Sequence, residues 1–155
     1  MERKQAEIRD FRRADLDPVL SILYESAVNS GFGGSREKYV SDVTKEMDLE
    51  RDVLRVLVSH DDRVMGCAWA APYPRDAESP QQAFLFDVSV RGSYRRQGYG
   101  TMLARDMMEQ LDDRGIGRIT TRLARRNEGG RALLENLGFE RTSDDGLWTE
   151  WSKAI

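Results

Sequence analysis

The sequence is poor in residues that form covalent or metal cross-links. Its 155 residues include one cysteine, Cys67, and one histidine, His60. A single cysteine excludes an internal disulfide framework, and this pair is too small for a zinc site built from Cys and His ligands. We therefore expect a protein without a metal centre, in a reducing compartment such as the cytoplasm.

Long apolar runs and a large excess of one charge are missing too. The first stretch, "MERKQAEIRDFRR", is interrupted by charges throughout, and no later run approaches the roughly 20 apolar residues that cross a bilayer. The 24 Lys and Arg residues nearly balance 27 Asp and Glu residues, for a formal charge of −3. We expect a protein that neither lies in a membrane nor binds nucleic acid through overall basicity.

The chain does contain interleaved strand and helix patterns. With 39% hydrophobic residues and no linker-like tract, its length suits a single domain spanning residues 1–155. Apolar periodicity and turn residues predict strands at 8–11, 53–59, 63–72, 83–90 and 118–124, then two more around 144–146. Helices are predicted from Asp15 or Asp17, over 36–47 within the weakly patterned segment 30–51, from the glycines near 98 to Gly115, and over 127–138. This order predicts an α/β or α+β fold with a mixed sheet.

The stretch "RRQGYGTML", from Arg95 to Leu103, places two glycines and two arginines where a helix begins. The start of a helix offers unpaired N–H groups and the positive end of the helix dipole. Gly98 and Gly100 would let that backbone approach a phosphate closely, and Arg95 and Arg96 would add charge for more than one anionic group. The stretch therefore predicts a pyrophosphate site, or else a tight strand-to-helix turn with a solvated basic edge.

Two common nucleotide-binding loops do not match this stretch. A nucleoside-triphosphate loop needs Lys and then Ser or Thr after its last glycine, but Thr101 and Met102 follow Gly100. A dinucleotide-binding loop needs a third small residue where Leu103 stands, and an acidic residue about 20 positions later, where "RITTRL" has none. Both interpretations are excluded.

The stretch instead resembles the phosphate loop of the GCN5-related N-acetyltransferase (GNAT) family. Arg95, Gly98 and Gly100 match its spacing of Arg or Gln, two residues, Gly, one residue, and Gly or Ala, directly after a strand ending in "VSV". A second family motif, an Asn before a helix that closes in Leu-Gly-Phe, is matched by Asn127 and residues 137–139. The resemblance implies a single-domain GNAT-like fold, with a mixed central sheet of about six to seven strands flanked by about four helices.

The resemblance also implies acetyl-CoA as the cofactor, with no metal. The strand that ends at Val90 would part there from its neighbour, and the pantetheine arm would lie in the gap. The amide groups of the arm would form hydrogen bonds with the backbone of Val88, Ser89 and Val90. The pyrophosphate would be held by Arg95, Arg96, Gln97, Gly98, Tyr99, Gly100 and Thr101. Asn127 would contact the cofactor near its thiol. The implied reaction transfers an acetyl group to a primary amine of a small molecule or to an exposed amino group of a protein, in a monomer or a homodimer.

The chain departs from the family at two catalytic positions. Leu134 stands where many members place a Tyr acid, and Arg122 stands where some members place a Glu base. Asp87, inside the apolar run "AFLFDVSV", is the candidate replacement base, because desolvation there would raise its pKa. A buried aspartate satisfied by backbone or by an arginine is the commoner case. The loss of both usual groups also leaves open a catalytically silent acyl-CoA-binding module.

Two further features keep their alternatives open. The basic stretch "RLARR", residues 122–126, could attract a ligand phosphate or form a solvated edge. Trp148 and Trp151 could pack in the core, line an acceptor pocket or form a dimer contact. Neither feature decides the function.

Overall fold

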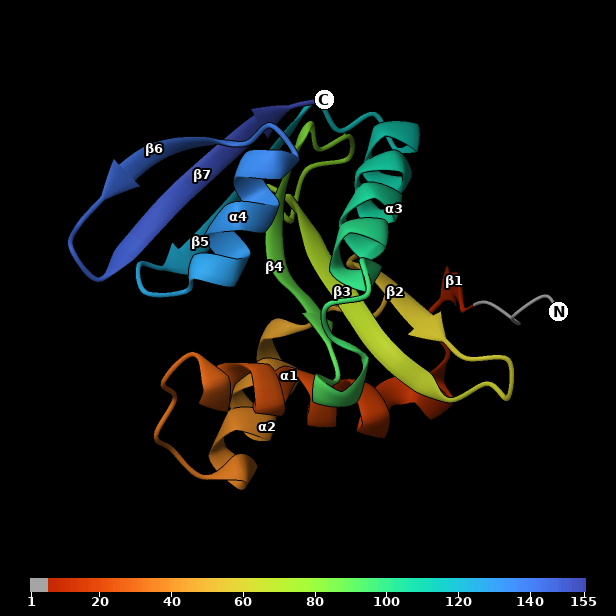
Figure 1. The fold of residues 1–155 in the computed structure, drawn as a ribbon. Coiled ribbons are helices and arrows are strands. Elements are labelled where there is room, and N and C mark those ends of the chain that lie inside the picture. Colours follow the sequence, from red (N-terminus) through yellow and green to blue (C-terminus); the bar gives the residue numbers. More distant parts are fainter. Residues whose placement is uncertain (1–5) are drawn as a thin grey trace, which may run out of the picture.

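The computed structural model describes residues 6–155, which form a seven-stranded mixed sheet and four α-helices (Figure 1). This confirms the predicted fold class; the first five residues of the predicted domain lie outside the described part. The elements are β1 (Glu7–Asp10), α1 (Leu16–Asn29), α2 (Arg36–Glu46), β2 (Val53–Val58), β3 (Val64–Tyr73), β4 (Gln82–Val90), α3 (Tyr99–Asp113), β5 (Arg118–Ala124), α4 (Glu128–Asn136), β6 (Glu140–Asp144) and β7 (Trp148–Ala154). Short 3-10 turns precede α1 and α3.

The helix boundaries lie where the sequence places caps and glycines. Asp15 is the N-cap of α1, and the Ser35 side chain caps α2 by accepting a hydrogen bond of 3.1 Å from the Lys38 N–H. Gly115 and Gly138 follow the ends of α3 and α4 with φ of +84° and +85°. Among residues 6–155, no helix combines the length and apolarity needed to cross a membrane.

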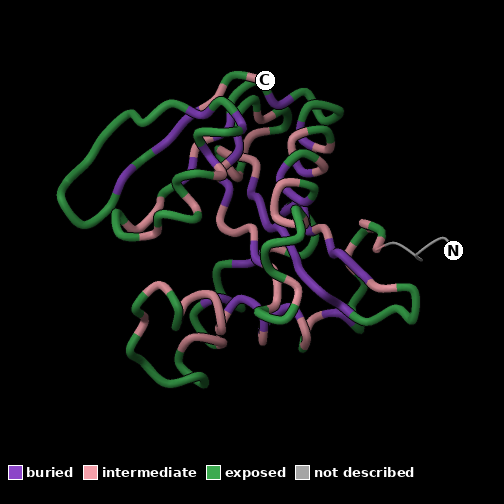
Figure 2. The backbone as a smooth tube through the Cα atoms, viewed as in Figure 1, coloured by how far each residue is buried: buried purple, intermediate pink, exposed green. Residues whose placement is uncertain are grey.

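The sheet has the strand order β1-β2-β3-β4-β5-β7-β6, and of the strand pairs within residues 6–155 only β4–β5 is parallel. Helices cover both faces. Leu103, Met107 and Leu111 of α3 pack with α4 and one face of the sheet, whereas Val19 and Leu23 of α1 pack with α2 and the other face. Figure 2 shows these buried stretches along the central strands and the inward side of α3. The sheet therefore lies between two apolar cores.

The parallel strands β4 and β5 separate partway along their length. Their pairing runs from Gln82 opposite Arg118 to Leu85 opposite Thr121, although β4 continues to Val90. The Thr121 hydroxyl donates to the Leu85 carbonyl, 2.8 Å away, where the pairing ends. The strands thus part after Leu85, and the expectation that they part after Val90 is wrong.

A β-bulge explains the early parting. On β3, Trp69 lies opposite Asp87 and Ala70 lies opposite Leu85, so Phe86 is the extra residue of β4. A bulge increases local twist and bends the strand. The Phe86 ring stacks on Trp69, with ring centres 4.1 Å apart. The apolar run "AFLFDVSV" predicted the strand, but it contains no glycine or proline that would indicate an irregularity.

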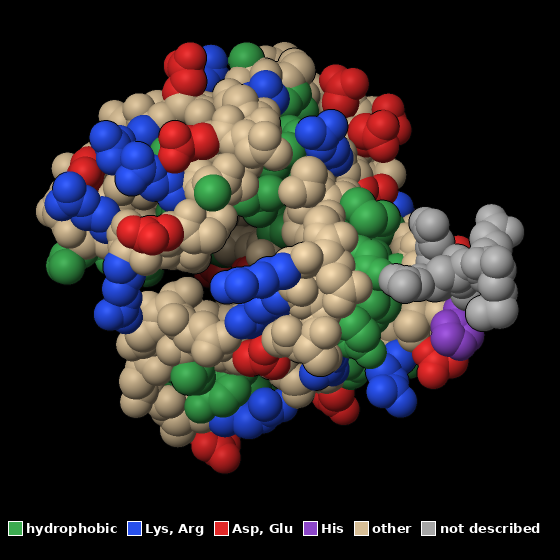
Figure 3. Space-filling view, viewed as in Figure 1, with side chains coloured by type: hydrophobic (Ala, Val, Ile, Leu, Met, Phe, Trp, Pro, Cys, Tyr) green, Lys and Arg blue, Asp and Glu red, His purple; other side chains and the backbone are tan. Residues whose placement is uncertain are grey.

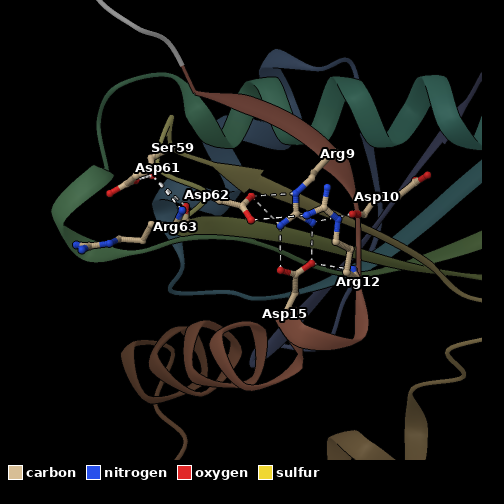
Figure 4. Close-up of polar contacts among 8 residues, drawn as sticks. All are labelled: Arg9, Asp10, Arg12, Asp15, Ser59, Asp61, Asp62 and Arg63. Carbon is tan, nitrogen blue, oxygen red and sulfur yellow. Dashed lines mark hydrogen bonds and ion pairs between the residues drawn. The ribbon is translucent and has the colours of Figure 1, made fainter.

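A partly buried ion pair joins β1 to the start of α1 (Figure 4). The Arg9 guanidinium donates to both oxygens of Asp15, at 2.8 and 3.0 Å, and contacts Asp62 in the β2–β3 turn at 3.2 Å. Asp15 also accepts the Arg12 N–H at 2.7 Å. The hydrogen bonds from Arg9 hold the pKa of Asp15 below its usual value, despite the burial of the carboxylate. We call this cluster of Arg9, Asp15 and Asp62 the β1–α1 corner.

Candidate active site

The parting of β4 and β5 leads into a groove made of three adjoining cavities. The central cavity, of about 260 Å³, lies between the two strands and is lined by Asp87, Arg122 and Leu134 among others. The loop-side cavity, of about 490 Å³, is lined by residues 88–90 and Arg95. The hairpin-side cavity, of about 680 Å³, lies toward the β6–β7 turn. Figure 3 shows the hollow between the part that carries α4 and the part that carries α1 and α2, with Lys or Arg side chains at its rim.

The cavities adjoin one another, because several residues line two of them. Ser30 and Asn127 line both the central and the loop-side cavities. Ala27 and Trp148 line both the central and the hairpin-side cavities. A ligand in the loop-side cavity can therefore reach Asp87 from one end of the groove, and a second ligand can reach it from the other.

The start of α3 has the geometry that the glycine pattern predicts. Gly98 is the N-cap with φ of +82°, and the first helical hydrogen bond runs from the Met102 N–H to the Gly98 carbonyl at 3.1 Å. The N–H groups of Tyr99, Gly100 and Thr101 precede that bond, so the helix offers them no acceptor. A Cβ at Gly98 or Gly100 would meet no atom within 4 Å. The backbone here is open, donor-rich and able to approach an anion closely.

Arg95 connects this loop to the open edge of β4. Its Nε donates to the Val90 carbonyl at 3.1 Å, and its Nη2 contacts Glu25 of α1 at 3.2 Å. Arg96 and Gln97 are exposed beside it, and Arg96 has a positive φ of 63°. From Phe86 onward, β4 has no pairing with β5. Val88, Ser89 and Val90 therefore present one backbone edge to the loop-side cavity.

Asn127 occupies the wall between two cavities. It is the N-cap of α4, and its Oδ1 accepts the Gly130 N–H at 2.9 Å. It lines both the central and the loop-side cavities. Capping fixes the side-chain oxygen toward the helix, so the Asn127 amide is held at the junction of the two cavities.

Asp87 is a half-buried carboxylate of the central cavity. Val88 and Val90 pack in the core under α3, so Asp87 and Ser89, which alternate with them, face the α1 side of the sheet. The Ser89 hydroxyl donates to Asp87 Oδ1. Burial raises the pKa of Asp87 from 3.8 to about 6, although Ser89 and the Val88 N–H oppose this shift. Among the ion pairs within residues 6–155, none involves Asp87.

Leu134 and Arg122, the two residues that depart from the GNAT pattern, both line the central cavity. Leu134 is 5% exposed and packs in the core, so it offers an apolar wall and no proton. The Arg122 guanidinium lies 5.0 Å from the centre of the Trp148 ring. Asp87 is therefore the carboxylate that the described residues place in this cavity.

The two tryptophans have different surroundings. Trp151 is buried, and its Nε1 donates to Thr149 Oγ1 at 2.8 Å, which confirms packing for that residue. Trp148 is 43% exposed and lines the central and hairpin-side cavities.

Sequence reasoning missed the contribution of α1, and it placed Arg126 in a basic stretch without its contact to this helix. Ser26, Ala27 and Ser30, near the end of α1, line the groove opposite β5. Arg126 Nη2 donates to the Ser30 carbonyl at 2.9 Å and so connects the β5–α4 loop to the end of α1. The small residues of "SAVNSG" are a weak signal that something approaches this helix face closely.

Comparison with known proteins agrees with this geometry. A family model described as "Acetyltransferase (GNAT) family" matches residues 20–139. Mycothiol acetyltransferase of Rhodococcus jostii is 28% identical over 87 residues, which are 56% of this chain and 28% of that protein. The ribosomal protein bS18-alanine N-acetyltransferase of Escherichia coli is 32% identical over 62 residues, 40% of this chain and 42% of that enzyme. The matched regions thus span less than half the length of these relatives.

Solved structures share the fold over almost the whole chain. A GCN5-related N-acetyltransferase from Kribbella flavida has a TM-score of 0.80 at 20% identity, over 97% of this chain and 98% of its own. The PaiA N-acetyltransferase of Thermoplasma acidophilum, solved in complex with coenzyme A, has a TM-score of 0.77 at 15% identity, over 97% and 99%. With a family model that covers most of its length, the chain belongs to the acetyltransferase (GNAT) family.

Proposed function

We propose that the protein is an N-acetyltransferase that uses acetyl-CoA to acetylate a primary amine. The observation that carries this proposal is the groove that runs from Arg95, in the loop before α3, along the edge of β4 that no strand pairs, to the carboxylate of Asp87, whose pKa is raised. The family supports acetyl transfer, and a structural neighbour was solved with coenzyme A. The acceptor is a small amine or an exposed amino group.

The loop-side residues fit the cofactor. The open space above Gly98 and Gly100 leaves room for a pyrophosphate beside the N–H groups at the start of α3. The backbone edge of Val88, Ser89 and Val90 can pair with amide groups of an extended arm, as an added strand would. Asn127 stands where that arm would end, next to the central cavity. Arg95 and Arg96 supply positive charge near the phosphates.

Asp87 performs the proton transfer in this proposal. When bound, the cofactor supplies an acetyl thioester. The ionised carboxylate of Asp87 accepts a proton from the acceptor ammonium, because only a neutral amine has the free electron pair needed for attack. Acetyl transfer would form the amide N–C bond and break the thioester C–S bond, and the second proton lost by the attacking nitrogen would pass through solvent to the leaving sulfur of coenzyme A. The apolar side chain of Leu134 gives the leaving sulfur no proton, so the protein contributes mainly base catalysis and positioning.

One observation favours a second candidate function. Neither Leu134 nor Arg122 supplies the acid or base that family members use at these positions. A catalytically silent acyl-CoA-binding module would share the groove and the phosphate loop. Release of free thiol from acetyl-CoA in the presence of an amine panel separates the two, because the silent module releases none.

The cofactor site is tested by a matched pair of glycine substitutions on α3. Gly98 and Gly115 lie at opposite ends of the helix with φ of +82° and +84°, and a Cβ at either would meet no atom within 4 Å. Gly98→Ala and Gly115→Ala therefore carry the same backbone strain, of about 1–2 kcal/mol. Only Gly98→Ala places a methyl group where the phosphates would lie.

We expect Gly98→Ala to weaken coenzyme A binding by about tenfold or more, measured by calorimetric titration, and Gly115→Ala to leave it unchanged. Coenzyme A should also raise the melting temperature of the parent protein and of Gly115→Ala. Equal affinity of the two variants would place the phosphates elsewhere. A parent protein that shows neither heat nor a thermal shift would remove the proposed function.

A further inference from the structure

The hairpin-side cavity is the part of the groove that the proposed cofactor leaves free. The loop-side cavity contains the β4 edge and Arg95, and the hairpin-side cavity contains Phe32 and the β6–β7 turn. The end of α1 and the β5–α4 loop line both cavities. It opens into the central cavity past Ala27 and Trp148. If the cofactor enters from the loop side, as the proposed function requires, the acceptor amine reaches Asp87 through the hairpin-side cavity.

The walls of the hairpin-side cavity are largely apolar. Phe32, Leu147 and Trp148 line it, and Leu147 and Trp148 are 76% and 43% exposed, which is unusual for large apolar side chains. The turn that presents them is held in place, because Asp145 accepts the N–H groups of Leu147 and Trp148 at 2.9 and 2.7 Å. A ligand with an apolar body would cover this surface.

Arg126 places a positive charge where the hairpin-side cavity meets the loop-side cavity, since it lines both. Its Nη2 donates to the Ser30 carbonyl, and its guanidinium packs so closely on Gly31 that a Cβ there would lie 1.5 Å from Nη2. Among the ion pairs within residues 6–155, none involves Arg126, whereas the neighbouring Arg125 pairs with Asp144 at 3.5 Å. A guanidinium has five N–H donors, and a neutral carbonyl uses one of them. The charge of Arg126 is thus held in position and available to an anion.

From this arrangement we propose that the acceptor is an amine that also carries an apolar group and a carboxylate. Its ammonium group would approach Asp87 in the central cavity, its apolar group would cover Leu147 and Trp148, and its carboxylate would bind Arg126. Arginine binds carboxylates through two parallel N–H bonds, which adds orientation to affinity. The opposite charges of Asp87 and Arg126 therefore match a zwitterion.

The test measures the binding of acetylated products, so that differences in the reactivity of the amines do not affect the result. N-acetyl-L-phenylalanine is compared with its carboxamide, and N-acetyl-alanyl-phenylalanine with its carboxamide, by calorimetry on the protein saturated with coenzyme A. Each pair differs only in the charge of the carboxyl group, and the two pairs differ in the spacing from the acetylated nitrogen. We expect the acid of at least one pair to bind about 10- to 100-fold more tightly than its amide.

Two variants test whether Arg126 causes the preference for the acid over the amide. Arg126→Gln should bind acid and amide equally, whereas Arg131→Gln, an exposed arginine of α4 paired with Glu135, should keep the preference. Equal binding of acid and amide by the parent protein in both pairs, or no binding of any of them, overturns the inference. A preference that survives in Arg126→Gln overturns it as well. These results are distinct from failure of the proposed function, which appears as a lack of coenzyme A binding in the first step.

Discussion

The β1–α1 corner and the central cavity each withdraw a carboxylate from solvent, but they treat it in opposite ways. In the corner, Arg9 donates to both oxygens of Asp15 and lowers its pKa. In the cavity, Asp87 has a serine hydroxyl and a backbone N–H as partners, and burial raises its pKa to about 6. One carboxylate is paired with a cation, and the other is left without one.

The presence or absence of a cation suits the two carboxylates to different roles: Asp15 to stabilising the fold and Asp87 to proton transfer. A carboxylate held by an arginine is fixed in its charged form and contributes to stability at neutral pH. A desolvated carboxylate without a cation costs stability when it ionises, but its pKa then lies near the pH at which it can exchange protons with a substrate. Substitutions in the two regions should therefore affect different measurements.

The largest effect is expected for Asp87→Asn, which keeps the shape of the side chain and removes its basicity. We expect kcat to fall by about 10²- to 10⁴-fold, the range typical of general-base removal, with coenzyme A affinity unchanged. In the parent protein, activity should rise with pH through about 6 as Asp87 ionises. The neighbouring Tyr39 and Cys67 have pKa values raised by burial, so they stay neutral in this range. Thiol release measured against pH tests both points.

The same variant has a distinctive effect on stability. Because the pKa of Asp87 is 3.8 when exposed and about 6 when folded, the folded state holds the proton more tightly between these values, and stability falls as pH rises through them. Asp87→Asn lacks this decline and should be at least as stable as the parent at pH 8. A variant that melts lower at pH 8 but keeps its turnover per folded molecule would instead identify a structural aspartate.

A smaller effect, on stability alone, is expected for Asp15→Asn. Removing this charge leaves the largely buried Arg9 with Asp62 as its remaining charged partner among residues 6–155, and should lower the free energy of unfolding by about 3 kcal/mol at pH 7. The pKa of Asp15 is lowered on folding, so the parent's advantage is present above its unfolded pKa of 3.8 and is lost as pH falls through the lower folded value. Urea unfolding at pH 7 and at pH 3 measures the difference.

The exposed pair of Lys38 and Asp42 on α2 provides the control, and Asp42→Asn should change stability by less than about 1 kcal/mol. Coenzyme A affinity should stay unchanged in both variants. Equal destabilisation by Asp15→Asn and Asp42→Asn would contradict the distinction between the two regions.

The smallest effect is expected for Thr121→Val, at the point where β4 and β5 separate. The change keeps the side-chain shape but removes the hydrogen bond to the Leu85 carbonyl, and should lower stability by about 1 kcal/mol. Thr142→Val, on the exposed strand β6, removes a longer bond of 3.3 Å and should cost less. Chemical unfolding of both variants tests this order, and turnover per folded molecule should be unaffected by either.

Local patterns predicted most of the fold, because they reflect interactions between residues close in sequence. Asp15 and Gly115 mark helix ends, and the alternation in residues 53–59 and 63–72 predicts the hairpin that the structure contains. The shape of the loop at the start of α3 also follows from its glycines. The bulge at Phe86 and the contact of Arg126 with Ser30 depend on distant segments and on which face of α1 meets the groove. No pattern within one segment carries that information.

The parting of β4 and β5 gives the sheet a third edge. The outer edges are the four-residue β1 and the entirely exposed β6, whose sequence "ERTSD" is polar and charged. Short or charged outer strands discourage other molecules from extending the sheet. The inner edge, residues 86–90 of β4, is recessed between α1 and α4, whose residues Ser26 and Leu133 line the same cavities. Its backbone groups, which β5 does not pair, therefore remain accessible to a slender ligand while being shielded from the strands of neighbouring molecules.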